Sequence, residues 1–208
     1  MNHDSLKTSL GEAAQAIKDG QLVAYPTDTV YGLGADATNA EAVNAVFTAK
    51  GRNPGTPVPV LISGMSMGLE LVKELTEKFE VLINEFWPGA LTIVVEATES
   101  VPPVVTAGTG TVGLRMPDNK VAVELIKMSG KPITGTSCNL SGEPPTKHVD
   151  EARNQMGDSV SVYVESECGD STAPSTVISL VTEPPTIFRL GEIAREDIEN
   201  IIGPVVLA

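Results

Sequence analysis

Small polar residues recur at the borders of apolar runs in the sequence. The segment 26–34 (PTDTVYGLG), the pair Ser137 and Asn139, and Ser175 all occupy such positions. Hydroxyls and backbone amides at the end of a strand are good ligands for a small polar substrate. Each segment taken alone also fits a turn closed by its own side-chain hydrogen bonds. Their shared placement in an aliphatic chain favours a common pocket.

Cationic residues accompany these segments. Lys50 and Arg52 stand where a predicted helix ends, and the following residues 53–57 (NPGTP) stiffen the chain. Cations at a helix C-terminus also suit the helix dipole without any ligand. Arg115 falls within an apolar run, and Arg189 lies in the last third of the chain. The planar guanidinium suits phosphate or carboxylate, but periodicity does not decide whether Arg115 faces solvent or an anion.

Several other kinds of site are disfavoured. The segment 108–113 (GTGTVG) fits the GxGxxG pattern, yet it enters a predicted strand, whereas a dinucleotide site requires a helix there. The chain has two histidines, so a histidine-ligated metal centre is not expected. Cys138 and Cys168 form no CxxC motif and are expected to be reduced thiols. We therefore expect no protein-bound metal.

Apolar periodicity predicts mixed helices and strands. Helical spacing predicts helices over 6–17, 40–50 (capped by Asn39), 67–75, 76–86, 119–129, 150–156 and 196–202. Short apolar runs predict strands over 22–25, 57–62, 91–96, 112–116, 133–136, 161–164, 176–181 and 186–190. The last two strands fit a hairpin, and Pro59 favours an edge position for the strand 57–62. The segment 101–110 is predicted to be a loop.

The length and composition indicate one folded domain. The chain has 208 residues, of which 41% are hydrophobic, and a formal net charge of −13. We expect a single α/β domain over 1–208, with a core over about 5–203 and a twisted mixed or largely antiparallel sheet flanked by helices. No secretion signal or run of about 20 apolar residues is present, so we expect a cytoplasmic protein without membrane contact. The acidic surface disfavours broad nucleic-acid binding but not a local basic pocket.

Seven segments in this order resemble the YrdC/TsaC family, the threonylcarbamoyl-AMP synthases. They are 26–34, 50–57, 87–92 (WPGALT), 112–117 (VGLRMP), 137–142 (SCNLSG), 175–176 and 189–191 (RLG). The resemblance implies a YrdC-like fold with a large, positively lined cavity, in the short single-domain form. It also implies a synthase that joins L-threonine, bicarbonate and ATP into threonylcarbamoyl-AMP and pyrophosphate for tRNA threonylcarbamoyladenosine modification.

The same resemblance implies roles for individual residues. The L-threonine ligands would be Thr29, Lys50, Arg115 and Ser175. The nucleotide ligands would be Arg52, Thr56, Thr111, Ser137, Asn139 and Arg189. Lys50, Arg52 and Arg115 would be catalytic through positioning and charge neutralisation, with Mg²⁺ entering with ATP and no covalent nucleophile. The chain departs from the common family pattern at Asp28, Leu61 and Cys138, which puts one threonine contact at Leu61 in question.

Partners and alternative functions also follow from the resemblance. Downstream threonylcarbamoyl-transfer proteins would consume the product, and tRNA or double-stranded RNA is an expected partner. The main alternative is an RNA-binding or ribosome-maturation factor without turnover, which the charge of −13 disfavours. A carbamoylation domain of hydrogenase-maturation type is disfavoured because the chain lacks the zinc-finger cysteines.

Overall fold

The computed structural model describes the backbone of residues 3–208 and the side chains from Ser5 onward. Its helices are α1 (His3–Lys18), α2 (Ala40–Lys50), α3 (Met65–Gly68), α4 (Glu77–Phe86), α5 (Pro103–Thr106), α6 (Lys120–Ser129), α7 (Val149–Met156), the 3-10 turn η1 (Gly157–Ser159) and α8 (Arg195–Ile202). Its strands are β1 (Val23–Tyr25), β2 (Gly32–Gly34), β3 (Val60–Leu61), β4 (Leu91–Glu96), β5 (Thr111–Arg115), β6 (Ile133–Thr134), β7 (Thr136–Ser137), β8 (Val162–Tyr163), β9 (Thr176–Ser179), β10 (Thr186–Arg189) and β11 (Val206–Leu207).

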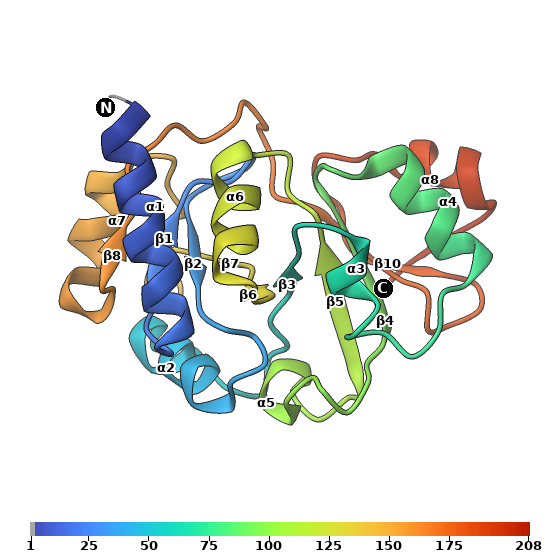
Figure 1. The fold of residues 1–208 in the computed structure, drawn as a ribbon. Helices are drawn as coiled ribbons and strands as arrows, with labels where there is room; N and C mark the ends of the chain where they lie inside the picture. The colour runs from blue at the N-terminus through green and yellow to red at the C-terminus, as the bar shows by residue number, and fades with distance from the viewer. Residues whose placement is uncertain (1–2) are drawn as a thin grey trace.

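The strands form two sheets that lie side by side (Figure 1). One sheet has the order β7-β2-β1-β8, and the other has the order β11-β10-β9-β4-β5-β3-β6. Both sheets contain parallel and antiparallel pairs, for example β1 with β8 and β1 with β2. The predicted α/β class with a mixed sheet flanked by helices is therefore confirmed, with the strands divided over two sheets.

Gly135 marks the point where the chain passes from one sheet to the other. The sequence predicts one strand over 133–136, but β6 ends at Thr134 in the larger sheet and β7 begins at Thr136 in the smaller one. A Cβ at Gly135 would stand 2.8 Å from Cδ2 of Leu61, so only glycine allows this close approach. The Gly135 N–H donates to the carbonyl of Pro59 at 2.7 Å.

Local capping signals define the helices that flank the sheets. The Asn39 side chain accepts hydrogen bonds from the first-turn amides of α2, and Asn119 does the same for α6. Gly51 and Gly130 end these helices with φ of 59° and 64°. The α1 and α6 helices pack together beside the smaller sheet, while α4 and α8 cover the larger one (Figure 1).

Four sequence predictions require correction. The strand 57–62 shortens to β3, and it lies inside the sheet between β5 and β6 because Pro59 falls just before the paired residues. The helix 67–75 is only the single turn α3, since Val72 instead forms a bridge with Ala97. The loop 101–110 contains α5, and β11 was not predicted.

Among residues 3–208, no helix is long and apolar enough to cross a membrane.

Candidate functional site

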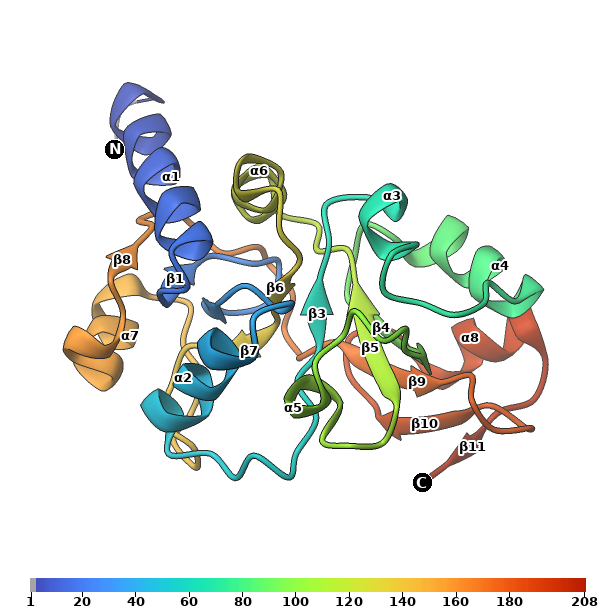
Figure 2. The same cartoon turned by 60° about the horizontal axis from the view of Figure 1, so that its bottom comes forward.

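Figure 2 shows the two sheets side by side, and residues of both line a cavity of about 1070 Å³. Strands β5 and β9 of the larger sheet and β7 of the smaller sheet contribute to its walls. Among the described residues, the ionisable side chains of the lining are four cations and no carboxylate: Arg52, Arg115, Lys147 and Arg189. The cavity thus presents cationic side chains in a chain whose formal net charge is −13.

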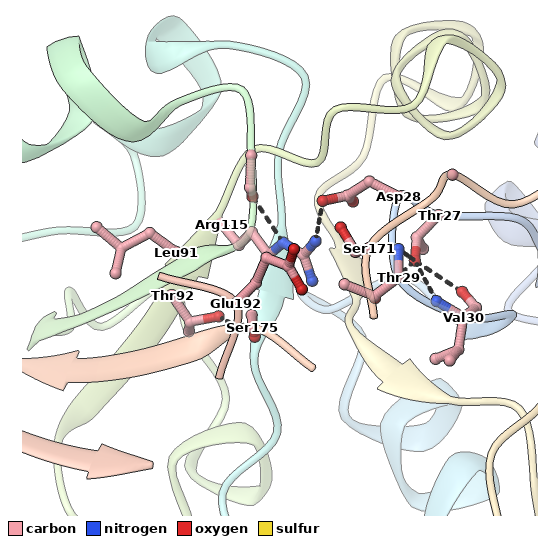
Figure 3. A network of polar contacts seen from close by, with 12 residues as sticks. Thr27, Asp28, Thr29, Val30, Leu91, Thr92, Arg115, Ser171, Ser175 and Glu192 are labelled. Atoms are coloured by element: carbon pink, nitrogen blue, oxygen red, sulfur yellow. Dashed lines mark hydrogen bonds and ion pairs between the residues drawn. The ribbon is translucent and has the colours of Figure 1, made fainter. Parts of the chain in front are cut away.

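Arg115 is the most deeply held of these cations. Its Nη2 lies 2.5 Å from Oδ2 of Asp28, and its Nε donates to the carbonyl of Gly89 at 2.9 Å. Both ion-pair partners are 6% exposed, and Asp28 Oδ1 has no hydrogen-bond partner among the residues that the structure describes. Figure 3 shows Arg115 between Asp28 on one side and Ser175 on the other. The structure thus resolves the question left open by the sequence, because Arg115 faces the cavity.

Thr29 lies in a turn fixed by its neighbour Thr27 (Figure 3). The Thr27 hydroxyl oxygen accepts from the amides of Thr29 and Val30 at 3.1 and 3.2 Å, and it donates to the carbonyl of Val30. The two threonine hydroxyls lie 3.0 Å apart. The self-bonded turn is therefore confirmed, and it places Thr29 on the cavity wall, whereas the role of Thr29 as a ligand stays a prediction.

Ser175 and Arg189 form a second polar unit at the ends of β9 and β10. Arg189 donates from Nε and Nη2 to the Ser175 carbonyl at 3.0 and 2.9 Å, and from Nη2 to Ser175 Oγ at 3.0 Å. The same Oγ lies 3.0 Å from Thr92 Oγ1. Partial burial, together with the nearby charge of Arg115, lowers the pKa of Arg189. Both residues line the cavity.

Arg52 is held at the opposite wall. Its Nη1 donates to Thr136 Oγ1 at 3.1 Å, and its Nη2 donates to the Pro57 carbonyl at 2.9 Å. Its guanidinium carbon lies 5.8 Å from the centre of the Phe47 ring, and burial lowers the pKa of Arg52. Ser137 and Thr111 also line the cavity, whereas Thr56 is exposed and lies outside the lining.

Lys50 and Asn139 stand behind the cavity wall. Lys50 is 4% exposed, and its Nζ donates to the carbonyls of Ser137 and Asn139 at 2.5 and 2.7 Å and to Asn139 Oδ1 at 3.3 Å. Burial lowers its pKa to about 8. Three acceptors match the three protons of the ammonium group. In this structure Lys50 therefore fixes the loop after β7, and neither it nor Asn139 is part of the cavity lining.

Cys138 and Leu61 occupy the two other positions where the chain departs from the pattern it resembles. Cys138 is buried, and burial raises the pKa of its thiol to about 12. Leu61 is 2% exposed and contributes to the cavity wall. Among the described residues, no three His, Cys, Asp or Glu side chains gather closely enough to hold a metal ion.

The segment 171–174, which joins β8 to β9, also lines the cavity and was not predicted from the sequence. Lys147 donates to the carbonyls of Gly169 and Ser171, both at 2.8 Å, and Glu192 accepts from the amides of Thr172 and Ala173. A Cβ at Gly169 would stand 2.8 Å from Cα of Asp28. The glycine was the one available signal, because a close backbone approach requires it.

These features define an α/β protein with a cavity between two mixed sheets, lined by arginine, lysine and hydroxyl side chains. The sequence profile of the Sua5/YciO/YrdC family, described as "Telomere recombination", matches residues 15–191. The chain belongs to this family. A Bacillus subtilis relative named threonylcarbamoyl-AMP synthase is 38% identical over 206 residues, covering 97% of this chain and 60% of its own length. A Vibrio vulnificus relative with the same name is 36% identical over 179 residues, which cover 85% of this chain and 96% of the relative's length.

Solved structures agree with the fold. The crystal structure of Pyrococcus abyssi Sua5 complexed with L-threonine is 38% identical, with a TM-score of 0.93 over 96% of this chain and 58% of that chain. Escherichia coli YciO, at 23% identity, shares the fold with a TM-score of 0.80 over 91% of this chain and 92% of its own. The chain thus spans about three fifths of the Bacillus and Pyrococcus relatives.

Proposed function

We propose that the protein is an L-threonylcarbamoyladenylate synthase, a nucleotidyltransferase that converts L-threonine, bicarbonate and ATP into threonylcarbamoyl-AMP and pyrophosphate. The observation that carries the proposal is a cavity lined by four cations and no carboxylate, in a chain 38% identical to a Sua5 crystallised with L-threonine. Downstream threonylcarbamoyl-transfer proteins would consume the product for tRNA modification, in the cytoplasm.

Thr29, Arg115 and Ser175 would bind L-threonine. All three line the cavity, and Arg115 offers a guanidinium to the substrate carboxylate. The ion pair with Asp28 and the bond to Gly89 hold that guanidinium in one orientation before the substrate arrives. The hydroxyls of Thr29 and Ser175 would orient the rest of the amino acid.

Arg52, Arg189, Ser137 and Thr111 would bind the nucleotide. ATP carries several negative charges, and one charge pair about 4 Å apart is worth about 4 kcal/mol at an effective dielectric of about 20. Arg189 lines the cavity from β10 of the larger sheet, and Arg52 lines it from the loop after α2, where it bonds Thr136 of the smaller sheet. Lys50 would support this site indirectly, by holding the loop that carries Ser137.

The proposed chemistry has two steps and no enzyme nucleophile. The threonine nitrogen forms a bond to the bicarbonate carbon, and a hydroxyl leaves as water after it takes a proton from the nitrogen. A carbamate oxygen then bonds to the α-phosphorus, and the bond to pyrophosphate breaks. The protein would hold the amine, bicarbonate and α-phosphate within reach and neutralise the phosphate charge.

Mg²⁺ would enter as part of the ATP substrate. The donor set agrees with this, because the lining offers hydroxyls from Thr111 and Ser137 but no carboxylates. Mg²⁺ commonly binds through substrate phosphates and water with few protein ligands. When present, the ion would neutralise phosphate charge.

A turnover assay tests the proposal. Purified protein is supplied with ATP, L-threonine and ¹³C-bicarbonate, with each omitted in turn, and pyrophosphate and the adenylate mass are measured. We expect pyrophosphate only in the complete mixture and an adenylate one mass unit heavier with the label. Arg115→Ala should reduce turnover at least 100-fold, whereas Arg153→Ala, at an exposed ion pair outside the cavity, should retain it. Pyrophosphate release without L-threonine would contradict the proposal.

A further inference from the structure

The edge of the cavity contains a β-bulge. In the pairing of β10 with β9, Ile187 is opposite Ile178 and Arg189 is opposite Val177, so Phe188 is an extra residue on β10. A bulge places two residues of one strand against one residue of its partner. Bulges are frequent beside active sites, where they redirect a side chain.

This bulge turns two consecutive side chains toward the same cavity. Alternate residues of a strand face the same side, and Ser175, Val177 and Ser179 all line the cavity. In regular pairing Phe188 would oppose Val177, and Arg189 would oppose Thr176, which is fully buried. With the bulge, both Phe188 and Arg189 line the cavity.

The Phe188 ring is exposed in a cavity whose lining includes several valines. Phe188 is 55% exposed, and Val94, Val177 and Val181 line the same cavity. Sheet pairing sets Val94 opposite Ser179, two residues from Val177. An exposed aromatic ring on the wall of a cavity is a surface on which a planar ligand can stack.

We propose that Phe188 binds the nucleobase of the nucleotide by stacking, while the adjacent Arg189 binds phosphate or ribose oxygens. The inference rests on the proposed function and specifies how the nucleotide is recognised. An aromatic side chain next to a cation matches the two parts of a nucleotide, a flat apolar base and an anionic chain. An aromatic ring can stack on any nucleobase, because every base has a π-face. This contact therefore supplies affinity rather than base selectivity.

The test measures binding in the absence of L-threonine, so that no turnover occurs. Isothermal titration calorimetry compares ATP with tripolyphosphate, which has no base, for the wild type and Phe188→Ala. Removing a base-stacking side chain weakens binding about 5- to 150-fold. We expect this loss for ATP and a change under 2-fold for tripolyphosphate. Phe188→Tyr should bind ATP as the wild type does, whereas Phe188→Leu, apolar but not flat, should lose most of the affinity.

Leu190→Ala is the matched control. Leu190 is 50% exposed two residues further along and is not part of the cavity lining. We expect its ATP affinity to equal that of the wild type. Equal ATP affinity of wild type and Phe188→Ala would overturn the inference and leave the proposed function standing, as would equal losses for ATP and tripolyphosphate. Failure of the wild type to bind ATP would overturn both.

Discussion

The buried pair of Asp28 and Arg115 gives the sharpest prediction about stability. Both residues are 6% exposed, and their closest polar atoms lie 2.5 Å apart. Removing one partner of a buried pair leaves the other charge uncompensated, which costs about 3–5 kcal/mol. We therefore expect Asp28→Asn and Arg115→Met each to lower the free energy of unfolding by about 3–5 kcal/mol.

The double variant measures the interaction between the two side chains apart from the interactions of each with its surroundings. With both charges removed, no buried charge remains uncompensated, so the double variant should lose at least 2 kcal/mol less than the sum of the two single losses. Urea unfolding of the four proteins at pH 7 measures this coupling. Losses that add to within about 0.5 kcal/mol would refute the reasoning, since distant independent sites behave in that way.

Three further predictions concern Lys50, Gly169 and the cysteines. Because burial lowers the pKa of Lys50 to about 8 from 10.5, the unfolded chain binds more protons between these pH values. The free energy of unfolding relative to Lys50→Met should therefore be constant below pH 8 and rise by about 3 kcal/mol as the pH reaches 10.5, as urea titrations can show. Gly169→Ala should cost about 1–3 kcal/mol because its Cβ would stand 2.8 Å from a neighbouring Cα, whereas Gly11→Ala, in an open helical position, should stabilise slightly. A thiol reagent at pH 8 should label half-buried Cys168 well before buried Cys138, and Cys168→Ser should abolish the fast phase; two equally fast phases would contradict the structure.

The fold was predictable from sequence where local signals determine it. Helix α2 begins after Asn39 and ends at Gly51, as the sequence indicates, because capping depends on neighbouring residues alone. The division of the strand 133–136 between two sheets was not predictable. It depends on the contact of Gly135 with Leu61, whose position in the fold no local pattern specifies.

Prediction of the candidate site from the sequence is limited in the same way. Thr29, Arg115 and Ser175 come from different elements, and only the motifs together indicated that they share a cavity. The placement of Lys50 behind the wall depends on carbonyls 87 and 89 residues away. The bulge at Phe188 likewise depends on pairing with β9 and leaves no signal in the composition of β10.

In the proposed function, the amino acid and the nucleotide share the cavity between the two sheets. A crystal structure of this chain with L-threonine and a non-hydrolysable ATP analogue tests it directly. We expect the amino acid against Thr29, Arg115 and Ser175, with its nitrogen directed toward the α-phosphate. We also expect the nucleotide in contact with Arg52 and Arg189. Either ligand bound outside this cavity, with the cavity filled only by water, would refute the proposed function of this site.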